Sequence, residues 1–410
     1  MNRVKLLLKN LFLFFRYGLR KRDTHVLLFG SWFGDKFADN SRFLFQYLAE
    51  NKEKYGIKTI VWATRNERVF DSLKSLGYTV VMIGTKESDY YHKTAGIHVV
   101  CNAGSSNNAS KGDIDGKFSY GAVRINLWHG IPAKGVDYAS IDYKKREKEH
   151  PFLMKIYYSL VGNKLIRAIG FQPGGWNDAY RLSTTPFVTG LFVDMTKLPA
   201  KKMIETGYPR NCTLSKLLPE ESNIINRIIE SEYSILYLPT FRSKKSNYTN
   251  PLDDSSIVQW IRDEEVLWIQ KPHSADKSML NAHTHDDSNI INLPDTFDIN
   301  VLLNHVDVVL TDYSSVCFDA IYHHKPVVYY VPDLEQYMTE DRGFVISPDE
   351  YMVGPKSFST EELLIHLKAV RLNGMNEMSN TYYNLREKIW NGDTEMEQIW
   401  KAICERANLR

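Results

Sequence analysis

The residues best suited to chemistry lie in four polar turns, each of which follows a predicted strand. Histidine, arginine, lysine and hydroxyl side chains dominate these turns, and such side chains move protons near neutral pH or bind phosphate. Because parallel strands bring their carboxyl ends to one edge of a sheet, an open α/β protein binds its ligand at such turns. The four turns are Trp128-His-Gly-Ile-Pro-Ala-Lys134, Pro239-Thr-Phe-Arg242, Lys271-Pro-His273 and Thr311-Asp-Tyr-Ser-Ser315.

Two histidines, His129 and His273, occupy corresponding strand ends in the two halves of the chain. A neutral imidazole could take a proton from an attacking hydroxyl, and a charged one could bind phosphate. A lone histidine at a strand end is more often a hydrogen-bonded structural residue. The matching positions favour a shared cleft, so we expect both histidines to be catalytic. We expect Trp128, Gly130 and Lys134 to bind substrate beside His129.

The turn that holds Ser314 and Ser315 follows the apolar strand expected at Val306–Leu310. Helix-like spacing resumes directly after it, so both serines lie at a predicted helix N-terminus. Unpaired N–H groups and a partial positive charge make such a position suitable for a phosphate. The alternative is that Asp312 or either serine only caps the helix. Several polar residues in one turn favour binding, so all three are candidates.

Further candidates for binding a diphosphate are cationic. Arg242 could hold two phosphate oxygens with its planar guanidinium, although a surface salt bridge is the alternative. Its position directly after a buried strand favours a contact with the ligand over a surface salt bridge. Arg342 is a second candidate cation, and Thr240 and Lys271 belong to the same set of turns.

Asp295 and Thr296 precede a short predicted helix that ends near His305. Either of them could contact a nucleotide. The alternative is that this segment is a helix start, with Asp298 in its first turn.

Several classes of site lack their sequence signatures. There is no P-loop, no GxGxxG at the start of a helix, and no GxSxG, which disfavours ATPase, dinucleotide-binding and serine-hydrolase functions. The four cysteines show neither CxxC nor zinc-like spacing, so we expect no metal site, no disulfide framework and a reducing, cytoplasmic compartment. No cofactor is required, because cationic side chains and helix ends could neutralise a diphosphate.

Strand-length apolar runs alternate with helical or turn-rich stretches along the whole chain, which predicts parallel, doubly wound sheets. The pattern restarts near residue 215, and 410 residues exceed one ordinary core, so we expect two Rossmann-like α/β domains facing a cleft. The predicted parts are an amphipathic helix (1–22), an N-terminal acceptor-side domain (23–210), a C-terminal nucleotide-binding domain (211–375) and a final helix crossing back to the first domain (376–410).

The first 22 residues combine Leu and Phe with seven basic residues and no acidic residue. Lys9 and Arg16 interrupt the apolar runs, so the segment is too short and too charged to span a bilayer. We expect an amphipathic helix on an anionic membrane surface, with docking on the protein itself as the alternative. The net charge of only +2 and the lack of a long basic stripe elsewhere argue against a nucleic-acid partner.

Taken in order, the polar turns resemble the motif series of the CDP-glycerol glycerophosphotransferases, which build teichoic acids and related capsule polymers. The resemblance extends from about Leu27 to Leu367 and also includes Lys325-Pro-Val, Arg342-Gly-Phe and Gly354-Pro355. It implies a GT-B-like fold and peripheral attachment to the cytoplasmic face of the membrane. It also implies transfer of an alditol phosphate from CDP-glycerol or CDP-ribitol to a hydroxyl of a lipid-linked or polymer acceptor, with release of CMP.

Carried onto this chain, the resemblance assigns His129 as the general base. It groups four residues around the diphosphate of the donor, and Asp312 lies in the same loop; the four are His273, Arg242, Ser314 and Ser315. Two alternatives remain open. The chain could be a GT-B glycosyltransferase that uses a nucleotide sugar, or a non-catalytic protein that binds a membrane surface.

Overall fold

The computed structural model describes residues 3–104, 112–170, 174–240, 248–271, 288–340, 343–374 and 380–409. The chain divides into two units, and each is considered by itself. Unit 1 comprises Met1–His129, Lys144–Lys216 and Asp393–Arg410, and unit 2 comprises Gly130–Tyr143 and Leu217–Gly392.

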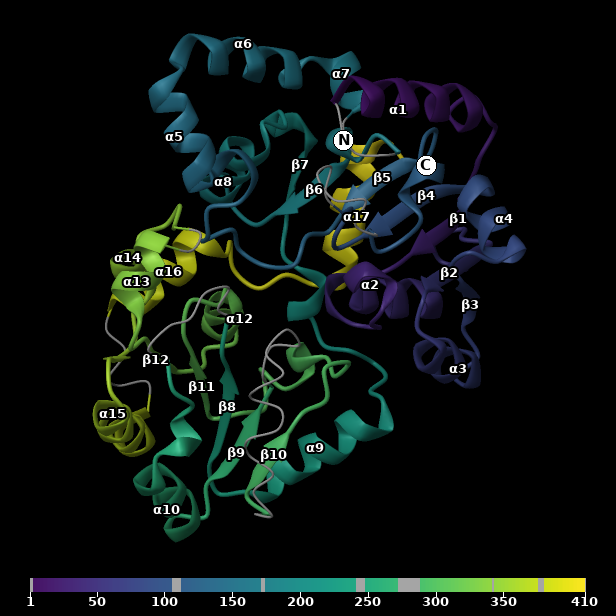
Figure 1. The fold of residues 1–410 in the computed structure, drawn as a ribbon. Helices are drawn as coiled ribbons and strands as arrows, with labels where there is room; N and C mark the ends of the chain where they lie inside the picture. Colours follow the sequence, from purple (N-terminus) through teal and green to yellow (C-terminus); the bar gives the residue numbers. More distant parts are fainter. Residues whose placement is uncertain are drawn as a thin grey trace. The chain divides into compact units, whose positions relative to one another are not determined.

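Unit 1 contains a seven-stranded parallel sheet in the order β3-β2-β1-β4-β5-β6-β7 (Figure 1). Its strands are β1 (Asp23–Phe29), β2 (Thr59–Thr64), β3 (Thr79–Met82), β4 (Ala95–Val100), β5 (Val123–Asn126), β6 (Tyr180–Ser183) and β7 (Met203–Glu205). Valine, isoleucine and leucine fill the central strands, as expected for a sheet that is covered on both faces.

The helices of unit 1 enclose this sheet, with an apolar core that includes Leu28, Val61, Val100 and Trp176. They are α1 (Arg3–Tyr17), α2 (Asp39–Glu50), α3 (Glu67–Ser75), α4 (Lys86–Thr94), α6 (Pro151–Gly162), α7 (Lys164–Ile169), α8 (Pro186–Thr196) and α17 (Met396–Ala407). Short 3-10 helices connect them: η1 (Trp32–Gly34), η2 (Gly116–Phe118), η4 (Trp176–Asp178), η5 (Ala200–Lys202) and η6 (Pro209–Asn211).

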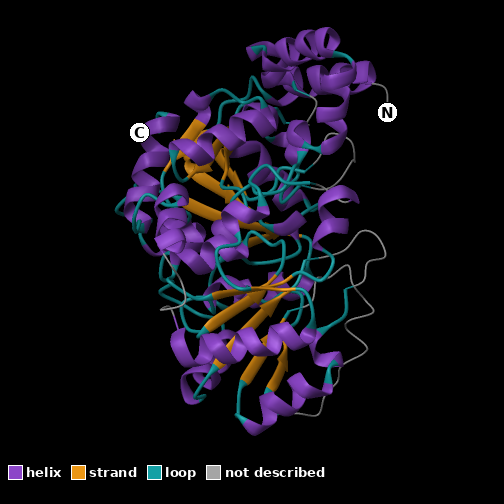
Figure 2. Ribbon diagram, turned by 90° about the vertical axis from the view of Figure 1, so that its left-hand side faces the viewer, coloured by secondary structure: helices purple, strands orange, loops and turns teal. Residues whose placement is uncertain are grey.

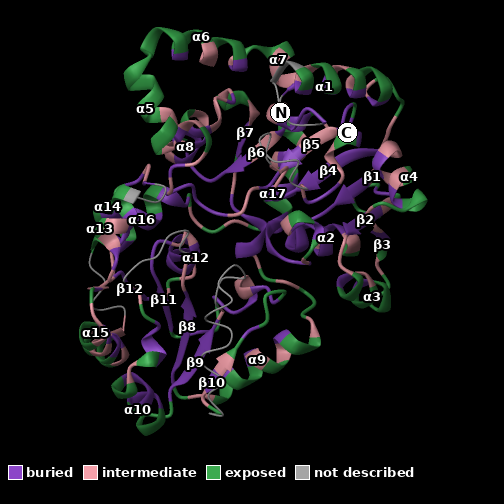
Figure 3. Cartoon of the chain, in the orientation of Figure 1, coloured by how far each residue is buried: buried purple, intermediate pink, exposed green. Residues whose placement is uncertain are grey.

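Unit 2 contains a six-stranded parallel sheet in the order β10-β9-β8-β11-β12-β13. Its strands are β8 (Ser234–Leu238), β9 (Leu267–Gln270), β10 (Ile290–Asn292), β11 (Val308–Thr311), β12 (Val327–Tyr330) and β13 (Lys356–Ser357). Helices and sheet alternate here as in unit 1 (Figure 2), and the strands of both sheets are mostly buried (Figure 3).

The helices of unit 2 cover its sheet and share an apolar core with it, which includes Ile235, Trp260, Trp268, Leu310 and Leu363. They are α9 (Pro219–Glu230), α10 (Ser255–Asp263), α12 (Val316–Tyr322), α13 (Leu334–Glu340), α14 (Pro348–Tyr351), α15 (Thr360–Asn373) and α16 (Asn380–Ile389), with 3-10 helices η3 (Asp137–Ala139), η7 (Pro251–Asp253) and η8 (Ile299–Val301). Helix α5 (Ile141–Glu149) crosses the boundary between the units at Tyr143 and Lys144 and buries no side chain.

Local sequence signals set several helix starts. The side chain of Asn66 accepts hydrogen bonds from the backbone N–H groups of Arg68 and Val69 at the start of α3. Thr85, Thr185 and Ser359 cap α4, α8 and α15 in the same way. These side chains satisfy N–H groups that the helix itself leaves unpaired.

The parallel sheets confirm the predicted fold class, but three features differ from the expected elements. Strands β6, β7 and β13 were not predicted, because each has four residues or fewer and no clear apolar run. The expected final helix is two helices, α16 and α17, separated near Gly392, whose φ of +73° does not suit a helix. Segment Gly130–Tyr143 groups with unit 2, because Val345 donates a backbone hydrogen bond to Ala133.

In each sheet the strand order reverses between two neighbouring strands. The reversal lies between β1 and β4 in unit 1 and between β8 and β11 in unit 2. Open α/β sheets bind their ligands outside the carboxyl ends of the strands at such a switch point. The polar turns after β8 and β11 therefore lie where a ligand site is expected.

Candidate functional site

At the switch point of unit 2, Asp312 joins the turns that follow β8 and β11. Its two carboxylate oxygens accept hydrogen bonds from the backbone N–H of Thr240 at 3.0 and 2.8 Å. One of them also accepts a hydrogen bond from the N–H of Tyr313 at 2.5 Å. The carboxylate is almost fully buried. Asp312 therefore holds the shape of the two turns.

Lys134 lies beside these turns within unit 2. Its Nζ donates to Thr240 Oγ1 at 3.4 Å and stands 5.4 Å from the ring centroid of Tyr337. The backbone of Lys134 forms an antiparallel bridge with Phe344, which fixes the segment in place. The structure thus brings Lys134, Thr240 and Asp312 together, although Lys134 lies more than 100 residues from the other two in the sequence.

The two candidate serines are half-buried at the start of α12. Ser315 is the residue that precedes the helix, and its side chain makes no capping hydrogen bond. Ser314 Oγ accepts a hydrogen bond from the N–H of Val316 at 3.4 Å. The serines lie two and three residues after Asp312, so they belong to the same turn.

Lys271 lies at the end of β9, next to β8 in the sheet. Its Nζ donates to the carbonyl of Phe297 at 2.6 Å and so holds the segment that carries Asp295 and Thr296, both of which are exposed. Asp298 accepts a hydrogen bond from the N–H of Asn300 and caps η8. This segment is therefore a helix start, which was the alternative to a nucleotide contact.

Three predicted site residues, Arg242, His273 and Arg342, lie outside the described residues. Their proposed roles stay predictions from the sequence.

In unit 1, His129 follows β5 at the carboxyl edge of the sheet. Its Nδ1 lies 3.4 Å from the backbone carbonyl of Cys101, which follows the neighbouring strand β4. A carbonyl can only accept, so this contact is a hydrogen bond when Nδ1 carries the proton. In that tautomer Nε2 has a free lone pair. The arrangement is the one that a general base requires.

Aromatic rings enclose this imidazole. The ring of Trp128 stacks on it with centroids 4.5 Å apart, and the ring of Trp32 lies 5.9 Å away. The guanidinium of Arg181, on β6, lies 4.4 Å from the ring centroid of Trp128. Burial lowers the pKa of His129, while Asp39 opposes this effect. His129 is therefore neutral at physiological pH.

The carboxyl edge of the unit 1 sheet also concentrates unusual backbone conformations. Trp32, Phe33, Asp39 and Trp128 all have φ between +44° and +65°, and Gly130 has φ of +141°. Residues other than glycine rarely adopt such angles, and they gather at functional sites where the surrounding structure holds them in place.

Asp113, which no sequence motif had indicated, occupies the switch point of unit 1. Its carboxylate accepts hydrogen bonds from the N–H groups of Phe33, Cys101 and Asn102 at 2.6 to 2.8 Å. It thus joins the turns after β1 and β4, as Asp312 joins those after β8 and β11. Burial raises the pKa of Asp113 to about 7, against the opposing effect of these three donors. Asp113 lies in a loop with no strand directly before it, so no pattern pointed to it.

The turn from Trp128 to Lys134 is shared by the two units. Trp128 and His129 belong to unit 1, whereas Gly130 and Lys134 belong to unit 2. Two sets of predicted residues are therefore brought together, each within its own unit. Trp128 and His129 form the first set, and the second consists of Lys134, Thr240, Asp312, Ser314 and Ser315.

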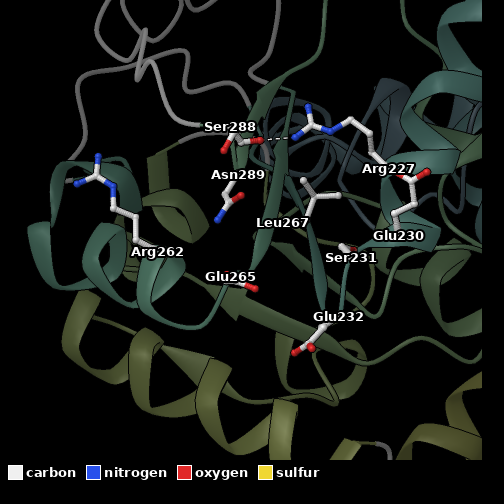
Figure 4. Close-up of a pocket in the computed structure, with 9 residues that line it drawn as sticks. All are labelled: Arg227, Glu230, Ser231, Glu232, Arg262, Glu265, Leu267, Ser288 and Asn289. Atoms are coloured by element: carbon white, nitrogen blue, oxygen red, sulfur yellow. Dashed lines mark hydrogen bonds between the residues drawn. The ribbon is translucent and has the colours of Figure 1, made fainter.

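A polar pocket of unit 2 lies away from these turns (Figure 4). It is formed where β8, β9 and β10 begin, at the amino ends of the strands, and in it Arg227 donates to the carbonyl of Ser288. Its lining residues are Arg227, Glu230, Ser231, Glu232, Arg262, Glu265, Leu267, Ser288 and Asn289. The amino ends form the edge of the sheet opposite the predicted site, and the sequence had not suggested this pocket.

Among the described residues, no group of three or more His, Cys, Asp or Glu side chains is arranged to hold a metal ion. None of the described helices has the length and apolar character needed to cross a membrane.

Comparison with known proteins identifies the family. Residues 12–392 match the model of the CDP-Glycerol:Poly(glycerophosphate) glycerophosphotransferase family. A teichoic acid poly(glycerol phosphate) polymerase of Bacillus spizizenii is 26% identical over 398 residues, which cover 94% of each chain. A teichoic acid glycerol-phosphate transferase of Staphylococcus aureus is 22% identical, over 98% of this chain and 97% of the relative.

The fold is also that of a solved relative. The structure of the wall teichoic acid polymerase TagF matches with a TM-score of 0.69 and 18% identity, covering 100% of this chain and 99% of the other. This match confirms the GT-B-like fold class. With the family model covering nearly the whole chain, the protein belongs to the CDP-glycerol:poly(glycerophosphate) glycerophosphotransferase family, and it is a transferase that depends on a CDP-alditol.

Proposed function

We propose that this enzyme transfers glycerol phosphate, or the related ribitol phosphate, from its CDP-alditol to a hydroxyl of a lipid-linked or polymer acceptor in teichoic acid or capsule synthesis. CMP is the second product. Family membership supports the donor class and the reaction. The residue roles below are supported by the geometry within each unit.

The observation that carries the proposal is the environment of His129. The imidazole is kept neutral by burial, and its Nδ1 faces a carbonyl that can only accept a hydrogen bond. Nε2 is then the atom that takes the proton of the acceptor hydroxyl. A neutral histidine with a fixed tautomer is suited to general-base catalysis at physiological pH.

The donor is assigned to the carboxyl edge of the unit 2 sheet. Lys134 provides a positive charge beside Thr240, and Ser314 and Ser315 provide hydroxyl donors in the turn held by Asp312. Lys271, Asp295 and Thr296 extend this edge toward β9. From the sequence, Arg242, His273 and Arg342 join this set, as additional cations for the diphosphate.

The proposed step is a displacement at the phosphorus nearest the alditol. The acceptor oxygen forms a bond to that phosphorus as its proton passes to His129 Nε2. The bond between this phosphorus and the bridging oxygen of the diphosphate breaks, and CMP leaves with the electron pair. Catalysis of such a transfer is mostly positioning and charge stabilisation, which the basic and hydroxyl side chains supply.

Attachment to the cytoplasmic face of the membrane is proposed through α1. Leu13 and Tyr17 pack on Phe118 and Tyr120, so one side of the helix docks on unit 1. Asn10 adds a hydrogen bond from its side chain to the carbonyl of Gly170 at 2.8 Å. The intramolecular docking considered as an alternative therefore accounts for one side of α1 only.

A different side of α1 exposes Leu8, Phe12 and Phe15, each about 60% accessible to solvent. The helix has 15 residues and so spans only about 22 Å, less than the roughly 30 Å hydrocarbon core of a bilayer. Apolar residues on one side together with basic residues suit a helix that lies in the plane of an anionic membrane surface.

The chemistry is tested with a panel of donors, comprising CDP-glycerol, CDP-ribitol and UDP-sugars, assayed for nucleotide release in the presence of a lipid-linked acceptor. We expect CMP release with one or both CDP-alditols and no release of UDP. Release of UDP without CMP would support the glycosyltransferase alternative and overturn the proposal.

The role of His129 needs its own arm of the experiment. His129→Ala is expected to abolish CMP release while leaving the affinity for CDP-glycerol within a few-fold of the native value. If the variant kept turnover within a few-fold, the assignment of the base would be wrong even though the donor class stood.

A further inference from the structure

We propose that three consecutive residues at the start of α2, namely Asp39, Asn40 and Ser41, position His129 for proton transfer. Together they contact Arg210, the backbone of Leu127 and Trp128, and Cys101, at the carboxyl edge of the unit 1 sheet. They are positioning residues, since none is assigned to contact substrate. The inference rests on the proposed role of His129 as the base and adds to it the residues that hold and tune it.

Asn40 holds the backbone on which His129 stands. Its Nδ2 donates to the carbonyl of Trp128 at 3.0 Å and lies 3.4 Å from the carbonyl of Leu127. Its Oδ1 accepts a hydrogen bond from the backbone N–H of Arg210 at 3.1 Å. Asn40 is fully buried, so water cannot replace these bonds without a change of structure. The unusual φ of Trp128 is thus fixed by a side chain nearly 90 residues away.

Asp39 binds the side chain of the same arginine. Its Oδ1 lies 2.9 Å from Arg210 Nη1, and the two side chains are 2% and 6% exposed. The same oxygen accepts a hydrogen bond from the N–H of Asn40 at 2.7 Å. The buried ion pair thus connects the start of α2 with η6 and orients Asn40 toward Trp128.

Ser41 contacts the segment that receives the hydrogen bond of His129. Its N–H and Oγ lie 3.3 and 3.2 Å from the sulfur of Cys101, whose carbonyl faces His129 Nδ1. Ser41 and Cys101 are both buried. The first turn of α2 therefore fixes both the chain that bears the imidazole and the carbonyl that selects its tautomer.

The charged and titratable groups around His129 come from several elements. Asp39 on α2 favours the protonated imidazole, whereas Arg210 on η6 and Arg181 on β6 disfavour it. The thiol of Cys101 stays protonated, because burial raises its pKa well above the usual value. Asp113 binds the N–H of Cys101, and Lys36 stacks on Trp32, the other ring beside His129.

The two members of the ion pair should therefore act on His129 in opposite directions. Replacing Asp39 removes a negative charge and lowers the pKa of His129, while replacing Arg210 removes a positive charge and raises it. A merely structural pair would not do this. Losing either partner leaves a buried charge unpaired, so both changes would destabilise unit 1 in the same direction.

The test compares Asp39→Asn and Arg210→Gln in the full chain. The acid limb of kcat/KM for CMP release, with CDP-glycerol as donor, is expected to move to lower pH in the first variant and to higher pH in the second. Shifts of about 0.5 to 1 pH unit are expected for neighbouring charges. NMR titration of the His129 imidazole, identified by its loss in His129→Gln, should show the same shifts without relying on activity.

A matched control is Asp178→Asn, which breaks another largely buried ion pair of unit 1, the one with Arg167. We expect it to lower the melting temperature and leave the acid limb in place. Shifts of the same sign in Asp39→Asn and Arg210→Gln, or no shift in either, would overturn the proposal while His129 kept its role. Full turnover by His129→Ala would instead contradict the proposed base.

A second variant covers the case in which the ion-pair variants do not fold. Asn40→Ala removes no charge: it deletes the contacts with the carbonyls of Trp128 and Leu127 and the hydrogen bond from the N–H of Arg210. We expect kcat to fall at least tenfold with the KM for CDP-glycerol unchanged, because unit 2 is assigned the donor. A kcat within twofold of the native value would contradict a positioning role for Asn40.

Discussion

Asp312 binds the backbone N–H of Thr240 through both of its carboxylate oxygens, at 3.0 and 2.8 Å, and so connects the two strand ends at the switch point of unit 2. One of these oxygens also accepts a hydrogen bond from the N–H of Tyr313, so the carboxylate has little hydrogen-bonding capacity left for a ligand. Asp312 was expected to bind substrate directly, but its contacts support a positioning role. In unit 1, Asp113 makes the same kind of connection.

Asp312→Ala should therefore affect both stability and donor binding. The backbone N–H groups of Thr240 and Tyr313 would lose a charged acceptor in a buried place, which costs on the order of 2 to 4 kcal/mol of unfolding free energy. The KM for CDP-glycerol should rise as the turn loosens. Chemical denaturation and CMP-release kinetics measure the two effects. Asp349→Ala is the control, since its side chain is 89% exposed, and it should change neither. An Asp312→Ala variant as stable as the native enzyme would contradict this role.

Lys134→Met tests the charge beside Thr240. A hydrogen bond to a charged group contributes about 1.5 to 3 kcal/mol, so the KM for the donor should rise roughly 10- to 100-fold. The matched control is Lys145→Met on α5, whose side chain is 72% exposed. Steady-state kinetics measure the KM for CDP-glycerol in both variants. Equal KM values would exclude Lys134 from donor binding.

The pH dependence of the reaction should reflect His129. Burial lowers the pKa of this histidine from its usual value near 6.5, and the imidazole acts as a base only when neutral. The rate should therefore stay constant as the pH falls toward 6.5 and decline only below it. A profile of kcat/KM against pH measures this limb. If activity began to decline well above pH 7, a group other than His129 would control the pH dependence.

A histidine outside the site should make stability depend on pH. Burial lowers the pKa of His92 to about 4, its Nδ1 donates to the carbonyl of Ser88, and its Nε2 accepts from the N–H of Asp115. The unfolded chain takes up a proton near pH 6.5, whereas the folded state resists it. His92 should thus lower the unfolding free energy as the pH falls from about 6.5 to 4, by on the order of 3 kcal/mol.

His92→Gln removes this titrating group and keeps a side chain that can still donate to Ser88. Denaturation of both proteins at several pH values isolates the contribution of His92 as a difference. The gap between the two curves should narrow as the pH falls. If the difference in unfolding free energy between the two proteins stayed constant from pH 7 to pH 4, the effect assigned to the burial of His92 would be wrong.

The exposed side of α1 should control binding to membranes. Replacing Leu8, Phe12 and Phe15 by Asn should abolish sedimentation with anionic vesicles and leave the melting temperature unchanged, because these side chains are mostly exposed to solvent. Vesicles of neutral lipids should bind the native protein more weakly. Leu372→Asn, at a residue 84% exposed on α15, is the control. Unchanged vesicle binding by the triple variant would exclude this side of α1.

Much of the fold follows from local pattern. Apolar runs such as Ser234–Leu238 are buried strands in the structure, and the polar turns after them begin where the strands end. Strand–helix alternation is enough to predict parallel sheets, since a crossover must bring the chain back to the same edge. The family resemblance rested on the same turns, which is why the sequence could indicate a CDP-alditol transferase.

The sequence could not show which residues support the site. The pair of Asp39 and Arg210 joins positions 171 residues apart, and Asn40 reaches the carbonyl of Trp128 across 88 residues. Hydrogen bonds and ion pairs over such separations carry no periodicity. Strand β7, with three residues, likewise depends on its neighbour β6 for its existence.

The sequence by itself therefore determined the longer helices and strands and the turns that carry reactive side chains, because these depend on neighbours within a few residues. Tertiary structure decided what each side chain does. It made Asp312 a support for Thr240 and paired Lys134 with a turn of unit 2. It also placed His129 against the carbonyl that selects its tautomer and among the aromatic rings that bury it, and this burial lowers its pKa. These roles depend on burial and on contacts between distant segments, which exist only once the chain has folded.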